Sequence, residues 1–223
     1  LRFFFWCLCA EARVGGLLSG KAGIVSIHVG EASEQLSLLF DVANQSNIPL
    51  SQYYPTHMNR SPELLQDGLR FIKGGGSIDF TASHTPEILD AGEIKCAHAL
   101  KYALDRGADE NRLTFSTDGH ASLPHFNKEG ILESLKVGAM DAMLNEYRDA
   151  VLEEGIHHST ALKAVTANPA RVLKLPRKGR LARGCDADLL LLDKDTLALR
   201  RVMAKGDWCL ADGETLKKGT FDR

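Results

Sequence analysis

The stretch Thr114-Phe-Ser-Thr-Asp118-Gly-His-Ala-Ser122 is a short apolar and β-branched run that ends abruptly in an acid, a glycine and further polar residues. This pattern predicts a strand that breaks into a loop, where catalytic and binding residues concentrate. Two earlier runs, residues 23–30 and 52–60, also deliver a polar side chain after an apolar segment, namely His28 and His57. Two histidines and an aspartate at strand ends suggest a metal site.

Apolar runs alternate with longer amphipathic runs from residue 23 onward, which predicts βα units. The four expected pairs of strand and helix are 23–29 with 32–45, 51–57 with 62–72, 77–83 with 87–106, and 112–117 with 129–154. Successive strands recur about every 30 residues, the length of a βαβ unit, so the strands should be parallel. Because polar residues end four consecutive units, a (β/α) barrel explains the pattern better than the alternative, an open doubly wound sheet.

The pattern changes after residue 157. Residues 157–173 predict a short helix, a break marked by Pro169 and another helical turn. The apolar run Leu189–Leu192 suits a buried strand, and two short strands are expected at Arg200–Lys205 and Trp208–Ala211. The last part of the chain is therefore a small β unit.

Composition limits the partners and the compartment. The 223 residues carry a formal net charge of −2, which gives no electrostatic argument for a nucleic-acid or membrane partner and favours a small molecule. Five cysteines without paired spacing indicate a reducing compartment, so we expect a cytoplasmic protein. The apolar residues 1–10 match a signal-peptide core in length but are too few for the ~20 that span a bilayer. We expect a chain that begins inside a truncated or misjoined protein, with a secretion signal as the alternative.

The candidate site combines His28, His57 and Asp118. Neutral imidazole is the commonest protein ligand of zinc, and catalytic zinc sites join histidines to a carboxylate while leaving a position open for water. Adjacent parallel strands lie ~5 Å apart, so both histidines can reach one ion. The alternatives are hydrogen-bonded structural histidines and, for Asp118, a turn residue favoured by Gly119.

Arg60 lies three residues after His57 and could clamp a substrate carboxylate through its guanidinium, or lie solvated in a loop. We keep His120 as a residue at the rim of the site. For His98, His157 and His158, solvent-facing or helix-capping roles are expected.

Several segments together resemble the isoaspartyl dipeptidases of the amidohydrolase superfamily. They are residues 11–23, the strand ending in His28, Pro55-Thr-His-Met-Asn-Arg60, Gly76-Ser-Ile-Asp-Phe-Thr81, Ser116-Thr-Asp-Gly-His-Ala-Ser-Leu-Pro124 and Gly184-Cys-Asp-Ala-Asp188. The resemblance implies an α/β fold, the C-terminal part of a metal-dependent-hydrolase (β/α)8 TIM-like barrel, with a flanking β-sandwich portion. We accordingly divide the chain into an atypical apolar N-terminus (1–10), a partial barrel (11–175) and a small β-sandwich portion (176–223).

The resemblance also implies a binuclear zinc centre and the hydrolysis of β-aspartyl dipeptides. In it, His28 and His57 match two metal ligands, Asp118 matches a metal-contacting proton acceptor, and Arg60 and Ser122 match substrate-binding positions. The family's early His-x-His motif and bridging carboxylated lysine have no counterpart in this sequence. We therefore expect at most one zinc ion per chain and low or absent activity.

Three functional hypotheses follow. The first is a zinc-dependent isoaspartyl dipeptidase that acts on small peptide substrates, with a homo-oligomer left open. The second is an inactive fragment or carboxylate-binding module, and the third is another amidohydrolase that acts on cyclic amides. Because four strands cannot close a barrel, we expect several apolar strand residues to be partly uncovered or masked by residues 1–10. These residues are Ile24, Val25, Ile78, Phe80 and Phe115.

Overall fold

A computed structural model describes residues 2–127 and 129–219 of the chain. It contains two compact units, Leu1–Lys174 and Leu175–Arg223, and each is described by itself. Leu1, which we assigned to the N-terminal segment, and residues 220–223, which we assigned to the β-sandwich portion, lie outside the described residues.

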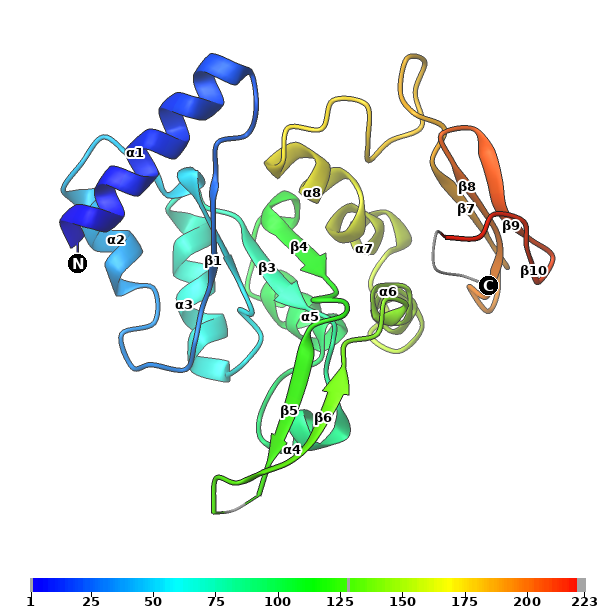
Figure 1. The fold of residues 1–223 in the computed structure, drawn as a ribbon, viewed down its shortest axis with the longest axis horizontal. Coiled ribbons are helices and arrows are strands. Elements are labelled where there is room, and N and C mark those ends of the chain that lie inside the picture. Colours follow the sequence, from blue (N-terminus) through cyan, green and yellow to red (C-terminus); the bar gives the residue numbers. More distant parts are fainter. Residues whose placement is uncertain (1, 128, 220–223) are drawn as a thin grey trace. The chain divides into compact units, whose positions relative to one another are not determined.

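The first unit alternates strands and helices along the chain (Figure 1). Its helices and strands are, in order, α1 (Arg2–Ser19), β1 (Val25–His28), α2 (Ser37–Asn44), β2 (Tyr53–Thr56), α3 (Pro62–Lys73), β3 (Ile78–Thr81), α4 (Pro86–Asp90), α5 (Cys96–Asp105), β4 (Leu113–Ser116), β5 (Ser122–Phe126), β6 (Leu132–Val137), α6 (Ala142–Leu152), α7 (His158–Val165) and α8 (Ala167–Val172). The two predicted helical segments are thus present as α7 and α8, but the break between them falls at Thr166, and Pro169 lies in the first turn of α8.

Four parallel strands form the centre of this unit. β1 pairs with β2 and β3 pairs with β4, both in parallel. β2 lies beside β3, where the backbone N–H of Met58 donates to the carbonyl of Asp79 at 3.1 Å. The predicted parallel α/β architecture is confirmed, and the order of the strands in space follows their order in the sequence.

Alternate residues of the four strands lie on two chemically different faces. The register places Val25 beside Tyr53 and Phe80 beside Phe115 on one face, where the remaining positions are also apolar. The other face carries Ser26 and His28 of β1, Tyr54 and Thr56 of β2, Asp79 and Thr81 of β3, and Thr114 and Ser116 of β4. Strand side chains alternate with period two, so one face is apolar and the other is polar throughout.

Helices cover the apolar face. Ser61 caps α3 by accepting from the backbone N–H of Leu64, and Pro62 supplies the first turn. Gly68 of α3 lies against Ile78, because a Cβ atom there would come within 3.0 Å of the Ile78 side chain. This close approach brings the helix onto β3.

The expectation of uncovered strand residues is wrong for three of the five. Ile78, Phe80 and Phe115 are buried, with at most 3% of their surface exposed, because they point toward the helices rather than toward the polar face. Ile24 lies just before the edge strand β1 and Val25 is its first residue, and both are half-buried.

Helix α1 runs without interruption through residue 10, so residues 2–10 do not form a separate segment. Its Phe5 ring stacks on Tyr53 of β2 at 5.7 Å between centroids, and Cys9 is fully buried. Gly16 allows the helix to pass close to the chain before β1, because a Cβ atom there would lie 2.5 Å from Gly23 Cα. None of the described helices is long and apolar enough to cross a membrane.

The helix predicted over residues 129–154 is wrong in its first half. A hairpin of two antiparallel strands, β5 and β6, occupies residues 122–137, and the helix begins only at Ala142. Leu132 and Leu135 have the i, i+3 spacing of a helix face, but both side chains are exposed on the hairpin, as is Val137. The third helical run is likewise divided, into α4 and α5.

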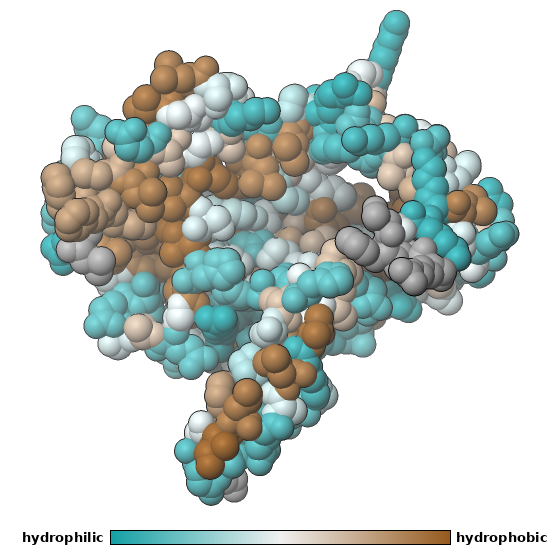
Figure 2. All heavy atoms as spheres, viewed as in Figure 1, coloured by the Kyte–Doolittle hydropathy of each residue, from teal (hydrophilic) through white to brown (hydrophobic). Residues whose placement is uncertain are grey.

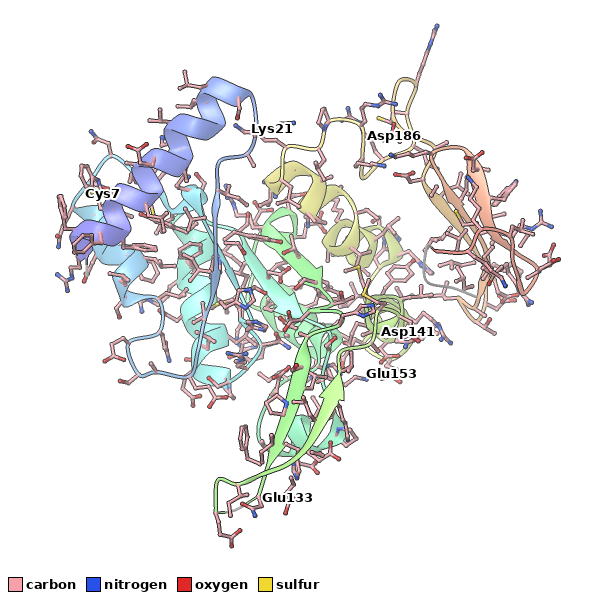
Figure 3. All side chains as sticks on the ribbon, viewed as in Figure 1. Cys7, Lys21, Glu133, Asp141, Glu153 and Asp186 are labelled. Atoms are coloured by element: carbon pink, nitrogen blue, oxygen red, sulfur yellow. The ribbon has the colours of Figure 1, made fainter. Side chains whose placement is uncertain are left out.

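Exposed apolar side chains of the first unit gather in two places on the face that Figure 2 shows. Figure 2 shows them over α1 and along the β5–β6 hairpin, where Phe126 and Leu132 are among the exposed residues. Figure 3 shows Glu133 near the far end of this hairpin, which extends away from the parallel strands.

The second unit contains one antiparallel sheet with the strand order β10-β9-β8-β7. The strands are β7 (Leu189–Leu192), β8 (Leu199–Ala204), β9 (Asp207–Ala211) and β10 (Glu214–Thr215). The predicted strands are present, but β7 is not buried as expected, since Leu190 and Leu191 are exposed by 50% and 45%. β7 is an edge strand of this sheet and pairs only with β8.

We expect Phe80→Ala to lower the free energy of unfolding by about 3–5 kcal/mol, because it removes a fully buried ring between the strands and the helices. The matched control is Phe126→Ala on the exposed hairpin, for which a change below about 1 kcal/mol is expected. Urea unfolding followed by circular dichroism measures both. Equal losses would contradict the described core.

Candidate metal centre

His28 and His57 meet at the carboxyl ends of β1 and β2. His28 is the last residue of β1 and His57 follows the last residue of β2, and the register pairs His28 with Thr56. His28 Nδ1 lies 3.2 Å from His57 Nε2, and the two rings pack edge to face with centroids 4.9 Å apart. The predicted convergence of these two histidines is therefore observed.

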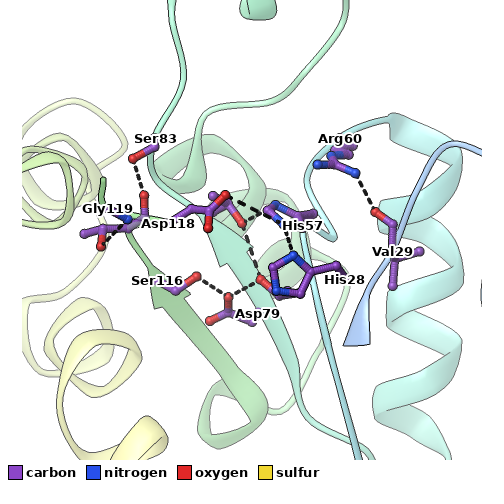
Figure 4. Close-up of polar contacts among 12 residues, drawn as sticks. His28, Val29, His57, Arg60, Asp79, Ser83, Ser116, Asp118 and Gly119 are labelled. Atoms are coloured by element: carbon purple, nitrogen blue, oxygen red, sulfur yellow. Dashed lines mark hydrogen bonds and ion pairs between the residues drawn. The ribbon is translucent and has the colours of Figure 1, made fainter. Parts of the chain in front are cut away.

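Asp118 reaches the same place from β4. It follows the strand by two residues, and its Oδ2 lies 4.0 Å from His57 Nε2 (Figure 4). Asp118 and His57 both have left-handed backbone conformations, with φ of +48° and +65°. Such conformations are unfavourable for residues with side chains and cluster at functional sites.

The surroundings of His57 keep its ring neutral. The residue is only 5% exposed, and burial above all lowers the pKa of His57 to about 4. The positive charges of Arg60 and His28 act in the same direction, whereas the carboxylate of Asp118 opposes them. A neutral imidazole has a lone pair available, which is the form that binds metals.

The largest feature that sequence reasoning missed is a buried acid, Asp79, on the polar face behind His57. Hydroxyl groups of Thr56, Thr114 and Ser116 donate to its carboxylate at 2.5–2.7 Å, and the Tyr54 hydroxyl lies 3.2 Å away. Burial raises the pKa of Asp79, and the four hydroxyl groups counteract this shift. The sequence carried a signal for this acid, because polar residues occupy every second position of β2, β3 and β4 and therefore share one face with Asp79.

Arg60 and Ser122, the two candidate substrate-binding residues, differ in their placement. Arg60 is half-buried, and its guanidinium donates to the carbonyl of Val29 at 2.8 Å, just beyond His28 (Figure 4). Ser122 is exposed at the start of β5, and among the described residues it has no hydrogen bond to Arg60 or to the histidines. The structure therefore brings Arg60 to the candidate centre and leaves Ser122 at the base of the hairpin.

The remaining histidines have other surroundings. His157 caps α7 and His98 is exposed on α5, as expected, while His120 is exposed at the beginning of the hairpin. His84, which follows β3, was among the polar residues at the strand ends but was not kept as a candidate site residue. Its Nε2 lies 3.1 Å from the buried carboxylate of Glu146, and its buried Nδ1 has no hydrogen-bond partner among the described residues.

Another missed residue, Glu93, lies near Arg60. Burial raises the pKa of Glu93 to about 7, and the charges of His84 and Arg60 oppose that shift. The neighbouring Ile94 is bound through its backbone to Asn59, which ties this loop to the turn that carries His57 and Arg60.

The nitrogens of His28 and His57 are spaced to bind one metal ion, but the carboxylate of Asp118 is too far away to share it. Two nitrogens bound to one tetrahedral zinc at ~2.0–2.1 Å lie ~3.3 Å apart, close to the separation of His28 Nδ1 and His57 Nε2. Asp118 Oδ2 is farther away, and within residues 2–127 and 129–219 no group of three or more His, Cys, Asp or Glu side chains is arranged to hold a metal ion. The histidine pair fits, and Asp118 has to move closer to share an ion.

Parallel βα units with histidines and an aspartate at the carboxyl ends of the strands define the class, a barrel-type α/β hydrolase fold. The profile of the amidohydrolase family matches residues 31–212. The chain belongs to the amidohydrolase family, and the predicted fold, part of a metal-dependent-hydrolase barrel, is confirmed.

Solved structures agree with this assignment. The chain is similar to the β-aspartyl dipeptidase of Fervidobacterium islandicum AW-1 in complex with a β-Asp-Leu dipeptide, with 38% identity and a TM-score of 0.88. A second structure of that enzyme gives 36% identity and a TM-score of 0.84. All of this chain is covered, but only 57% and 55% of those chains. The recognised resemblance to the isoaspartyl dipeptidases is therefore confirmed.

A more distant likeness concerns the fold alone. An adenosine deaminase of Xanthomonas campestris with bound zinc shares 19% identity and a TM-score of 0.52, covering 88% of this chain and 47% of that one.

The lowered pKa of His57 predicts a pH dependence of stability. Below pH ~6.5 the unfolded chain takes up a proton at this position that the folded chain refuses until about pH 4. His57 should therefore make folding progressively less favourable as the pH falls from about 6.5 to about 4. Urea unfolding at a series of pH values measures this.

His57→Asn is the comparison for that experiment, because asparagine also tolerates a left-handed backbone. The variant should lose stability less steeply over the same interval. Parallel curves for the two proteins would show that His57 titrates normally in the folded state.

Proposed function

We propose that this chain carries part of the active site of a zinc-dependent hydrolase that cleaves β-aspartyl dipeptides. The observation that supports this most is the meeting of His28, His57 and Asp118 at the ends of three strands from separate parts of the sequence. The similarity to a β-aspartyl dipeptidase points to the substrate class.

In this proposal His28 and His57 hold the metal through Nδ1 and Nε2, and Asp118 acts beside them. Bound zinc supplies Lewis-acid chemistry, which polarises a peptide carbonyl and makes water more acidic. Asp118 accepts the proton of the attacking water and delivers it to the leaving amine. Its position beside His57, with no hydrogen bond between the two, leaves the carboxylate free for that transfer.

Arg60 binds a carboxylate of the substrate. A guanidinium has five N–H donors, and the bond to the Val29 carbonyl uses one and fixes the group next to His28. The remaining donors suit a bidentate bond to a carboxylate, such as the free α-carboxylate that a β-aspartyl dipeptide carries on its aspartyl residue. Ser122 would add a hydroxyl from the start of β5.

The residues present suggest one zinc ion at most per chain, because His28, His57 and Asp118 provide three ligands and none bridges to a second centre. The metal is held more weakly than by a complete ligand set, so turnover should be low or absent. The five cysteines, all free in the described structure, support a reducing, cytoplasmic location. A homo-oligomer remains part of the proposal without a named interface.

Zinc titration by calorimetry on metal-free protein tests the centre. We expect at most one zinc per chain, and loss of binding by at least about tenfold in His57→Ala, because one of two nitrogen ligands is removed. His98→Ala, which removes an exposed histidine on α5, is the matched control and should bind as the parent does. Unchanged binding in His57→Ala, or two tight ions per chain, would refute the proposed site.

Substrate binding tests Arg60 separately from turnover. Binding of β-Asp-Leu to the zinc-loaded chain should weaken in Arg60→Lys by about tenfold, because lysine keeps the charge but loses the bidentate geometry. Arg106→Lys, on a guanidinium that stacks on Tyr102 at the end of α5, is the control.

The products of a parallel assay separate the alternatives. Hydrolysis of the dipeptide supports the peptidase, and binding without hydrolysis supports a carboxylate-binding module. Turnover of a cyclic amide alone would favour another amidohydrolase activity.

A further inference from the structure

A path of hydroxyl groups joins the buried acid Asp79 to His57. The Thr56 hydroxyl donates to Asp79 Oδ2 at 2.6 Å. Thr56 Oγ1 lies 3.4 Å from Thr81 Oγ1, which in turn lies 2.8 Å from His57 Nδ1. The opposite ring nitrogen, Nε2, faces His28 and Asp118.

The hydroxyl proton of Thr81 can be donated in two directions, to Thr56 or to His57. If Thr81 donates to Thr56, its oxygen accepts a proton from His57 Nδ1, and Nε2 keeps a lone pair. If Thr81 instead donates to His57 Nδ1, the proton of the neutral ring sits on Nε2 and is donated to His28 Nδ1. In that second arrangement His57 Nε2 and His28 Nδ1 are hydrogen-bonded to each other, so neither has a lone pair available for a metal.

The charge of Asp79 selects between these arrangements. Each hydroxyl has a single proton, and Thr56 gives its proton to the carboxylate over a short distance. Thr56 can then only accept from Thr81, although their contact is long. Donation from His57 through Thr81 and Thr56 to Asp79 is the arrangement in which both threonine hydroxyl groups donate and also accept.

We propose that Asp79 is a positioning residue which, through Thr56 and Thr81, holds His57 in the tautomer protonated on Nδ1, with the lone pair of Nε2 directed at the candidate metal centre. Metal-binding histidines commonly donate their second ring N–H to a group that fixes the tautomer. The use of this tautomer in metal binding rests on the proposed function, but its presence does not.

The placement of Asp79 is costly without such a role. The residue is 1% exposed, and its four partners are neutral hydroxyl groups. Burying an acid is costly unless it is well bonded, and an apolar side chain would fill the space at no such cost. The carboxylate of Asp79 can only accept, so the hydroxyl groups around it all donate toward it.

Nitrogen NMR of the histidine rings in metal-free protein at neutral pH tests the proposal directly. Protonated and unprotonated ring nitrogens have well-separated shifts, and His57→Gln identifies the His57 signals by their loss. We expect the Nδ1-protonated tautomer of His57 to exceed the other by about tenfold.

Thr56→Val and Thr114→Val form a matched pair of variants. Each removes one threonine hydroxyl from Asp79, but only Thr56 lies on the path to His57. We expect Thr56→Val to shift the population toward the Nε2-protonated tautomer and Thr114→Val to leave it unchanged, whereas a merely structural effect would be the same in both.

The outcomes separate this inference from the proposed function. A wild-type His57 protonated on Nε2, or equal shifts in the two variants, would overturn the inference, and the wild-type spectrum decides even if a variant fails to fold. Zinc titration of the same samples reports on the metal site independently. The expected tautomer in a protein that binds no zinc would support the positioning role and reject the proposed function.

Discussion

The parallel register of the four strands determines most of what the first unit can do. Because neighbouring strands are in phase, residues that share a face share a chemical character, apolar toward the helices and polar on the opposite side. Each buried apolar side chain, such as Phe80, contributes about 1.5–3 kcal/mol. An unsatisfied buried polar group costs about 1–3 kcal/mol, so the polar face is tolerated only because its groups bond one another. The network around Asp79 thus satisfies the polar groups that the register brings together on this face.

The same register carries the candidate centre, but a strained turn shapes it. His57 has a left-handed backbone, which costs about 1–2 kcal/mol in a residue with a side chain. Several bonds offset this cost. The N–H of Met58 bonds to β3, and the N–H of Arg60 closes the turn onto the carbonyl of His57. The fully buried Asn59 amide bonds the backbone of Thr81 in both directions. This turn directs His57 toward His28 and Arg60 toward Val29.

The sequence was sufficient to predict the parallel strands and the positions of His28, His57 and Asp118, because strand ends are marked by a change from apolar to polar residues. It was not sufficient for the β5–β6 hairpin, where Leu132 and Leu135 have the i, i+3 spacing of a helix face although both lie exposed on an antiparallel ribbon. Alternation in β3 was visible, but a pattern of period two does not say which face the helices cover. That ambiguity led to the wrong expectation for Ile78 and Phe80, and it hid the role of Asp79.

The geometry of the candidate centre is determined by contacts within residues 25–138. His28 and His57 are aligned by the β1–β2 register, and the hydroxyl of Thr81 holds the far side of the His57 ring. The loop with Asp118 is fixed to the end of β3 through the bond from Ser83 to the carbonyl of Thr117. Gly138 packs so closely on Asp118 that a Cβ atom would lie 2.7 Å from its carbonyl oxygen. Since each candidate ligand position is held by its neighbours in this chain, the two histidines are preorganised for the metal we propose, and only the Asp118 side chain would have to adjust to share it.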